Sequence, residues 1–165
     1  MKKVVNVGIG EFKVAKAPAV LVTHNLGSCV GVALYDVYHK IGGLAHITLP
    51  SYRDMGTRNK NSRDAKFADS AIPLMIEMME EAGAKLNFTV AKIAGGADMF
   101  GLPSNIPFKL DVGRQNVDKV KYCLKKYGII LAAEEVLGNI PRSMELDLDT
   151  GKVTLRTSQR KERFL

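Results

Sequence analysis

Short runs of β-branched and aliphatic residues, separated by turn signals, fill most of the first third of this 165-residue chain. They cover residues 4–9, 19–23, 28–36 and 41–49, with glycine, proline or asparagine between them. Runs of this length with such boundaries are typical of β-strands. A chain that begins in this way is constrained to build a sheet and to cover its apolar faces.

Two later segments have helical periodicity instead. In residues 64–82 apolar side chains recur every three or four positions up to Gly83, and residues 115–127 carry an apolar face that ends at Gly128. Further strands are predicted at 89–94, 129–136, 143–148 and 152–157, the last two around an Asp-Thr-Gly turn. Many strands, mostly joined by hairpins, together with two main helices predict a layered α+β fold.

The bulk composition is that of a single globular domain over residues 1–165. Hydrophobic residues make up 46% and charged residues 25%. No apolar run reaches the roughly 20 residues that a membrane-spanning helix needs, so we expect no insertion into a membrane. The N-terminus does not have the pattern of a signal peptide. We therefore expect a cytoplasmic protein, with residues 158–165 as a flexible basic tail.

The chain carries a net charge of +7, and the surplus is concentrated in residues 51–66 and in the tail. The first of these segments is polar and aperiodic, which predicts a long surface loop. We hypothesise that Arg58 and Lys60 in this loop steer an acidic partner. Nucleic acid is not the expected partner, because neither basic segment has interleaved aromatic residues or a nucleic-acid-binding motif.

A cysteine and a histidine lie on two consecutive predicted strands. A four-residue loop at 36–39 would pair Tyr35 with Lys40, and in that register Cys29 lies directly opposite His46. Directly opposed Cβ atoms are about 4.5–5.5 Å apart, so the sulfur would meet the imidazole. A slip of one residue would move the histidine to the other face, whereas a slip of two would leave the pair diagonal on the same face.

A thiol beside an imidazole is the arrangement of a cysteine nucleophile and its base, and we expect the imidazole to lower the pKa of the thiol. Gly27 permits a tight turn just before the thiol, and amides near Gly27 and Ser28 are candidates to bind an oxyanion. Taken by itself, however, a free cysteine is more often buried and inert, which is the interpretation we give Cys123. No cluster has metal-ligand spacing, so neither a metal nor another cofactor is expected.

The residues that carry these patterns resemble those of a known family. They are Thr23, Leu26-Gly27-Ser28-Cys29-Val30, Ala45-His46 with Leu49-Pro50, Ala94-Gly95-Gly96-Ala97 with Met99-Phe100, and Gly113 with Asn116-Val117. In identity, order and approximate spacing they are similar to the chemoreceptor glutamine deamidases of the CheD family, from about Val7 to Thr154. Two departures stand out: Leu137 replaces one glycine of a second glycine pair, and the segment 101–112 is longer than usual.

The resemblance implies an α/β/β three-layer sandwich and a specific activity. Selected glutamine side chains of methyl-accepting chemotaxis receptors, in bacterial or archaeal chemotaxis, would be hydrolysed to glutamate and ammonia through a thioester. The family's catalytic cysteine, histidine and threonine fall on Cys29, His46 and Thr23. We interpret Gly95 and Gly96 as a turn that shapes the wall of the site. The same thioester route predicts a minor activity on glutamyl methyl esters.

Other functions remain open at this stage. The resemblance implies a CheC-type phosphatase as a regulatory partner, and one alternative is that binding this phosphatase is the main role while catalysis is vestigial. Another is a broader Cys–His amide hydrolase or a transglutaminase-like enzyme that acts on other proteins. The presence of Thr23, Cys29 and His46 together favours an active enzyme.

Overall fold

The structure is a computed structural model that describes residues 2–51, 65–101, 103, 105, 107, 110–159 and 161–165. These residues form two five-stranded sheets and two α-helices. The first sheet has the order β1 (Lys3–Asn6), β3 (Ala19–Leu26), β8 (Arg142–Asp147), β9 (Val153–Thr157) and β10 (Glu162–Phe164). The second has the order β2 (Phe12–Lys16), β5 (Ile41–Ile47), β4 (Val30–Asp36), β6 (Thr89–Gly95) and β7 (Ile130–Val136).

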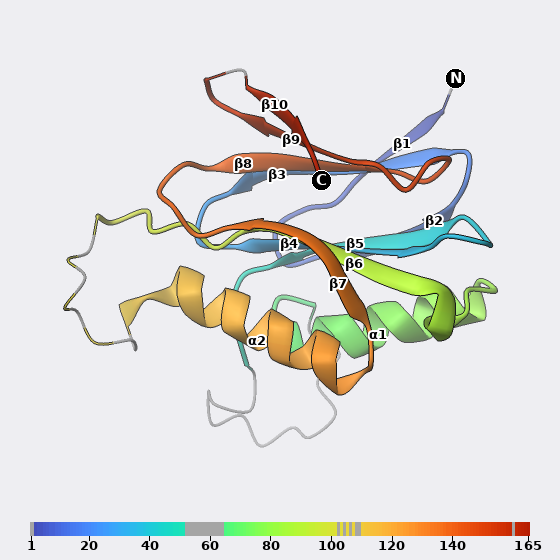
Figure 1. Cartoon of the computed structure of the whole chain (residues 1–165), viewed down its shortest axis with the longest axis horizontal. Helices are drawn as coiled ribbons and strands as arrows, with labels where there is room; N and C mark the ends of the chain where they lie inside the picture. The colour runs from blue at the N-terminus through green and yellow to red at the C-terminus, as the bar shows by residue number, and fades with distance from the viewer. Residues whose placement is uncertain are drawn as a thin grey trace.

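The elements stack in three layers, which Figure 1 shows from the edge. Helices α1 (Ala68–Glu81) and α2 (Val112–Lys126) cover the outer face of the β2-β5-β4-β6-β7 sheet, and the other sheet covers its inner face. Both sheets are mixed, because β1 pairs with β3 and β6 with β7 in parallel while the other pairings are antiparallel. The predicted α/β/β sandwich is confirmed.

Strand β4 lies at the centre of its sheet and is buried on both faces. Its alternation divides the core in two, as a pleated strand requires. Val30, Val32 and Leu34 pack with the helices, whereas Ala33 and Tyr35 pack with the other sheet. Because the two apolar cores share this one sheet as their common wall, we infer that the described residues form one domain.

The structure adds elements that the sequence did not predict. Strand β2 was not predicted. Two of its five residues are lysines, and it lies at a sheet edge where its residues are exposed or only partly buried. Strand β10 lies where we expected a flexible tail over residues 158–165: Glu162–Phe164 pair with β9, and the ammonium of Lys152 lies 3.5 Å from the centre of the Phe164 ring. A 3₁₀ turn at Leu86–Phe88 precedes β6.

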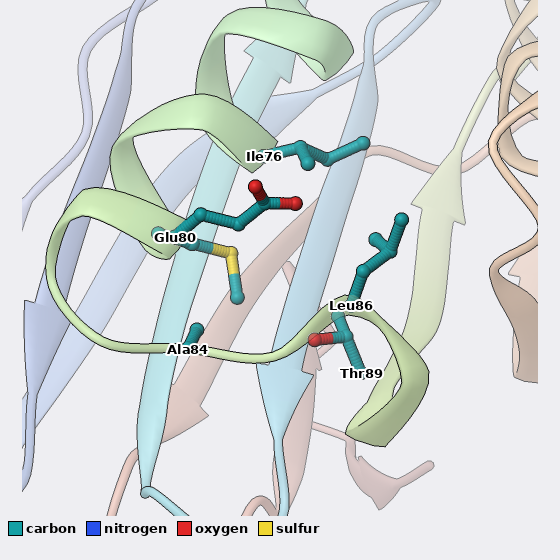
Figure 2. Close-up of a pocket in the computed structure, with 6 residues that line it drawn as sticks. Ile76, Glu80, Ala84, Leu86 and Thr89 are labelled. Atoms are coloured by element: carbon teal, nitrogen blue, oxygen red, sulfur yellow. The ribbon is translucent and has the colours of Figure 1, made fainter.

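The end of the molecule where α1 finishes holds a small hollow, shown in Figure 2. Its walls include Ile76, Leu86 and Thr89, and its volume is about 10 Å³. That is space for about one water molecule. Thr89 pairs with Asp36 at the far end of β4 from Cys29, so this hollow is separate from the candidate site described below.

Candidate active site

Cys29 lies at the rim of the space between the two sheets. Strand β4 begins at the next residue, Val30, and Cys29 is a partly exposed residue that contacts the core between the sheets. The same face of the strand carries Gly31, where a Cβ atom would lie only 2.7 Å from the sulfur of Met144 in the opposite sheet. The thiol is therefore directed into the layer between the sheets, at a position that solvent reaches.

The pairing of β4 with β5 differs from the predicted register by two residues. Gly31, not Cys29, lies opposite His46, because Asp36 remains in the ladder opposite Ile41. The Asp36 carboxylate accepts hydrogen bonds from the amides of the two loop residues that follow Val37, and Lys40 closes the loop with a positive φ of 55°. The loop therefore covers residues 37–40 instead of the predicted residues 36–39.

This shift preserves the face on which the pair lies. Cys29 and His46 become diagonal neighbours on the face that points to the other sheet, with Gly31 between them contributing no side chain. Diagonal residues of an antiparallel pair have Cβ atoms about 7–8 Å apart or somewhat less, within reach of long side chains. The thiol and the ring thus face the same interlayer space from adjacent strands.

Thr23 reaches the same space from the opposite sheet. Its side chain and that of His46 are both fully buried, and the Thr23 Oγ1 lies 2.7 Å from His46 Nδ1. The single hydroxyl proton is donated to the carbonyl of Val7 at 2.8 Å. The hydroxyl must therefore accept from the ring, which assigns the proton of the neutral imidazole to Nδ1.

With the proton on Nδ1, the other ring nitrogen of His46 carries a free lone pair. Nε2 is buried and has no hydrogen-bond partner in the part of the chain that the structure describes. A buried, unpartnered acceptor costs about 1–3 kcal/mol in stability, so such atoms are uncommon outside functional sites. This is the nitrogen that a proton donor entering the interlayer space would meet.

Burial shifts both ionisable groups toward their neutral forms. It raises the pKa of the Cys29 thiol, an effect that the cysteine's own backbone amide opposes only in part. Burial also lowers the pKa of His46 below its ordinary value of 6.5. The expectation that the imidazole would depress the thiol pKa is therefore wrong: burial is the dominant influence, and it favours the neutral form of both groups.

The backbone around Cys29 is anchored through three successive carbonyl groups. The Gly27 carbonyl accepts from the amide of Ala97 at 2.8 Å, that of Ser28 accepts from the side chain of Asn116 at 2.9 Å, and that of Cys29 accepts from the amide of Gly96 at 2.8 Å. The nucleophile's backbone is thus fixed from two sides, by the amides of Gly96 and Ala97 and by the side chain of Asn116.

The four residues predicted to bind an oxyanion or to shape the site surround this segment. The amide of Gly27 donates to Asn25 and that of Gly96 donates to Cys29, so both already have acceptors. Gly95 has a φ of 110°, and a Cβ there would lie 2.2 Å from the Cys29 carbonyl oxygen. We therefore keep the amide of Ser28 as the candidate oxyanion donor, and the site-shaping role of the glycines stays a prediction.

The turn at Gly95 is itself held by a buried arginine. Arg142, from the opposite sheet, donates to the carbonyls of Gly95 at 3.0 Å and Glu135 at 3.1 Å, and also to that of Leu137. Leu137 has a positive φ of 67°, which lies in the left-handed region that favours glycine. Its amide donates to the Gly95 carbonyl as well.

Sequence reasoning did not assign roles to Asn116 and Arg142. Asn116 entered only as part of the family resemblance. The one sequence signal for a special role was a polar residue on the apolar side of a predicted helix, next to Val117. Arg142 follows Pro141 at a strand start and has no sequence signal of its own. The predicted steering residues Arg58 and Lys60 lie outside the described residues.

Within the described residues no group of three or more His, Cys, Asp and Glu side chains is placed to hold a metal ion. None of the described helices is both long enough and apolar enough to cross a membrane. Cys123, the other cysteine, is buried in the core on α2, and burial raises its pKa to about 11.

The fold and the site together define a class: a three-layer α/β/β sandwich with a thiol, an imidazole and a hydroxyl gathered at one end of its interlayer space. Comparison with known proteins gives the family. The family model described as CheD chemotactic sensory transduction matches residues 48–157. This chain belongs to the CheD family.

Curated relatives extend the likeness over nearly the whole chain. A protein of Desulforamulus reducens named "Probable chemoreceptor glutamine deamidase CheD" is 47% identical over 154 residues, which is 93% of this chain and 90% of the relative. A protein of Clostridium botulinum with the same name is 45% identical over 155 residues, 94% of this chain and 93% of the relative. The family-model match begins after His46, whereas the likeness to these relatives covers 93–94% of this chain.

Proposed function

We propose that this protein is a chemoreceptor glutamine deamidase that hydrolyses glutamine side chains with Cys29 as nucleophile, His46 as base and acid, and Thr23 as the residue that orients the ring. The names of its relatives support the reaction and the receptors as its substrates. The observation that carries the residue roles is the Thr23–His46 hydrogen bond, because it leaves Nε2 unprotonated in the space that the Cys29 thiol faces.

The first half of the reaction forms a thioester. The Cys29 sulfur attacks the carboxamide carbon of a glutamine side chain while His46 Nε2 takes the thiol proton. Because burial favours the neutral form of both groups, we propose that this proton moves during the attack. The carbon–nitrogen bond then breaks as Nε2 returns the proton to the leaving nitrogen, and ammonia departs.

The second half of the reaction releases glutamate. Water attacks the thioester carbon as His46 Nε2 removes one of its protons. The carbon–sulfur bond then breaks, and Nε2 returns that proton to the sulfur, which restores the thiol. In both halves negative charge develops on the substrate oxygen, and we assign its stabilisation to the backbone amide of Ser28, which adjoins the nucleophile. The Ser28 carbonyl is held by Asn116, which fixes the position of this segment.

The same chemistry extends to esters. A glutamyl methyl ester presents the same carbonyl with a better leaving group, so we propose a minor methylesterase activity through the same Cys29 thioester. Methanol release from methylated receptor fragments, lost in Cys29→Ala, measures it.

The surface beside the nucleophile suits a protein substrate. A shallow hollow lined by Ser28, Met99 and Phe100 on one side and by the residues from Leu110 to Gly113 on the other adjoins the Cys29 segment. The side chains of Phe100 and Met99 are 82% and 46% exposed. Large exposed apolar side chains next to a site are typical of surfaces that bind other proteins.

A regulatory complex with a CheC-type phosphatase, and action in the cytoplasm, remain predictions.

The test is deamidation of purified receptor cytoplasmic fragments, read by mass spectrometry as the mass gain from exchange of an amide NH₂ for OH. Wild-type protein and the matched cysteine control Cys123→Ala are expected to convert specific glutamines, and Cys29→Ala is expected to convert none. Conversion by Cys29→Ala would end the assignment of the nucleophile. Equal conversion of casein would instead favour a broader amide hydrolase.

A further inference from the structure

Asn116 occupies the point at which the two strands of the candidate site separate. The ladder between β4 and β5 ends with the pair Val30–Ile47. Beyond it, the amides of Thr48 and Leu49 turn away to the carbonyl of Lys66, at 2.9 and 3.0 Å. Residues 28–29 and Thr48 therefore have no ladder bonds to each other, although they continue from the strands that carry the thiol and the imidazole.

The side chain of Asn116 spans this gap from helix α2. Its Nδ2 donates one hydrogen to the carbonyl of Ser28 at 2.9 Å and the other to the carbonyl of Thr48 at 3.1 Å. Both acceptors are carbonyl oxygens, so the amide nitrogen must face them and the orientation of the side chain is settled by chemistry. One carboxamide thus takes the place of the missing ladder bonds between the residue before Cys29 and the residue two after His46.

Asn116 is kept in this place at a cost in stability. The residue is fully buried, and its Oδ1 has no hydrogen-bond partner within the described residues. An unsatisfied buried acceptor is destabilising, and the position lies among apolar residues of α2 such as Val117 and Val120. The two donated bonds are therefore the physical reason for an asparagine here.

We propose that Asn116 is a positioning residue that fixes the relative placement of Cys29 and His46 by tying their two strand ends together. The proposal rests on the function proposed above, but it concerns the geometry of the pair and not the identity of the substrate. Without the tie, the segments that follow the last ladder pair lose their common anchor. A displacement of about 1 Å of a reacting group is enough to reduce a rate by about 100-fold.

The test uses the variant Asn116→Ala with Val120→Ala as matched control, since Val120 is equally buried on the same helix but contacts neither strand end by a hydrogen bond. Two quantities are measured: kcat and KM for receptor fragments, and the pH dependence of Cys29 alkylation by iodoacetamide, followed by peptide mass with Cys123 as the internal unreactive thiol. Asn116→Ala is expected to reduce kcat about 10- to 100-fold with little change in KM. It is also expected to shift the alkylation profile of Cys29.

Val120→Ala is expected to lower the melting temperature without changing either quantity. Asn116→Ser, which keeps one donor, is expected to fall between wild type and Asn116→Ala, and it takes the place of the alanine variant if that variant does not fold. A folded Asn116 variant with wild-type kcat and a wild-type alkylation profile would overturn the proposal. Alkylation does not depend on any substrate, so it tests the positioning role even if receptor fragments are not deamidated.

Discussion

Replacement of Thr23 by valine is the sharpest perturbation of the candidate site. Valine has nearly the same shape as threonine, so the packing between the sheets is preserved and only the hydroxyl is lost. That hydroxyl makes two buried hydrogen bonds, to the Val7 carbonyl at 2.8 Å and from His46 Nδ1 at 2.7 Å. The variant leaves a buried carbonyl and a buried ring N–H without partners.

The expected magnitudes follow from these two contacts. Each unsatisfied buried group costs about 1–3 kcal/mol, so Thr23→Val, which leaves two of them, is expected to reduce the free energy of unfolding by about 2–6 kcal/mol. The effect on the reaction is separate. Without the acceptor at Nδ1, the ring is no longer held with Nε2 unprotonated, and we expect kcat to fall by about 10²- to 10⁴-fold.

Three measurements on Thr23→Val and on the control Thr23→Ser check this reasoning. Urea unfolding gives the stability, deamidation of receptor fragments gives kcat, and ¹⁵N chemical shifts of His46 report which nitrogen carries the proton. Thr23→Ser retains a hydroxyl and is expected to keep the Nδ1–H tautomer and most of the activity. If Thr23→Val also keeps that tautomer and a wild-type kcat, the orienting role of Thr23 is refuted.

Three further outcomes are expected from the structure. Burial lowers the pKa of His46, so near pH 6.5 the unfolded chain binds a proton that the folded chain does not yet bind. The free energy of unfolding should therefore fall as the pH drops below about 6.5. In urea titrations, the free energy of unfolding of His46→Gln should depend less on pH. Gly96→Ala should lower the melting temperature more than Gly128→Ala, by an extra cost of about 1–3 kcal/mol, because the two share a positive φ but only at Gly96 would a Cβ meet a neighbour, the Val117 methyl at 2.3 Å. Asp36→Asn should cost about 2–3 kcal/mol in urea unfolding, because the buried carboxylate accepts from three backbone amides and an imidazole; a loss below about 0.5 kcal/mol would contradict this account.

The architecture followed from local patterns in the sequence. Strand β4, which is buried on both faces, has a nearly continuous apolar sequence, and both β4 and the mostly buried β6 were predicted nearly to their ends. Strand β2 was not predicted, since a five-residue edge strand that contains Lys13 and Lys16 has only a short apolar signal and owes its conformation to pairing with β5. Short β10 is likewise formed by a neighbour, β9, and not by its own composition.

The candidate site was predicted as a set of residues but not as a geometry. The alternation along β4 placed Cys29 on the correct face, yet the exact partner of His46 depended on a loop that was misread. The positive φ of Lys40 and the turn contacts of Asp36 fix that loop, and neither has a clear sequence signal. Asn116 and Arg142 act on backbone carbonyls of residues far away in the chain, which local reasoning does not detect.

The bond between Thr23 and His46 joins the two sheets, and this has a consequence for how the protein gains its activity. Neither sheet alone contains the hydroxyl, the ring and the thiol, so a refolding intermediate in which both sheets had formed but not yet docked would have native-like circular dichroism and no turnover. Activity should return only with the final docking of the layers, later than the recovery of secondary structure. Enzyme assays during refolding would then time that last step directly.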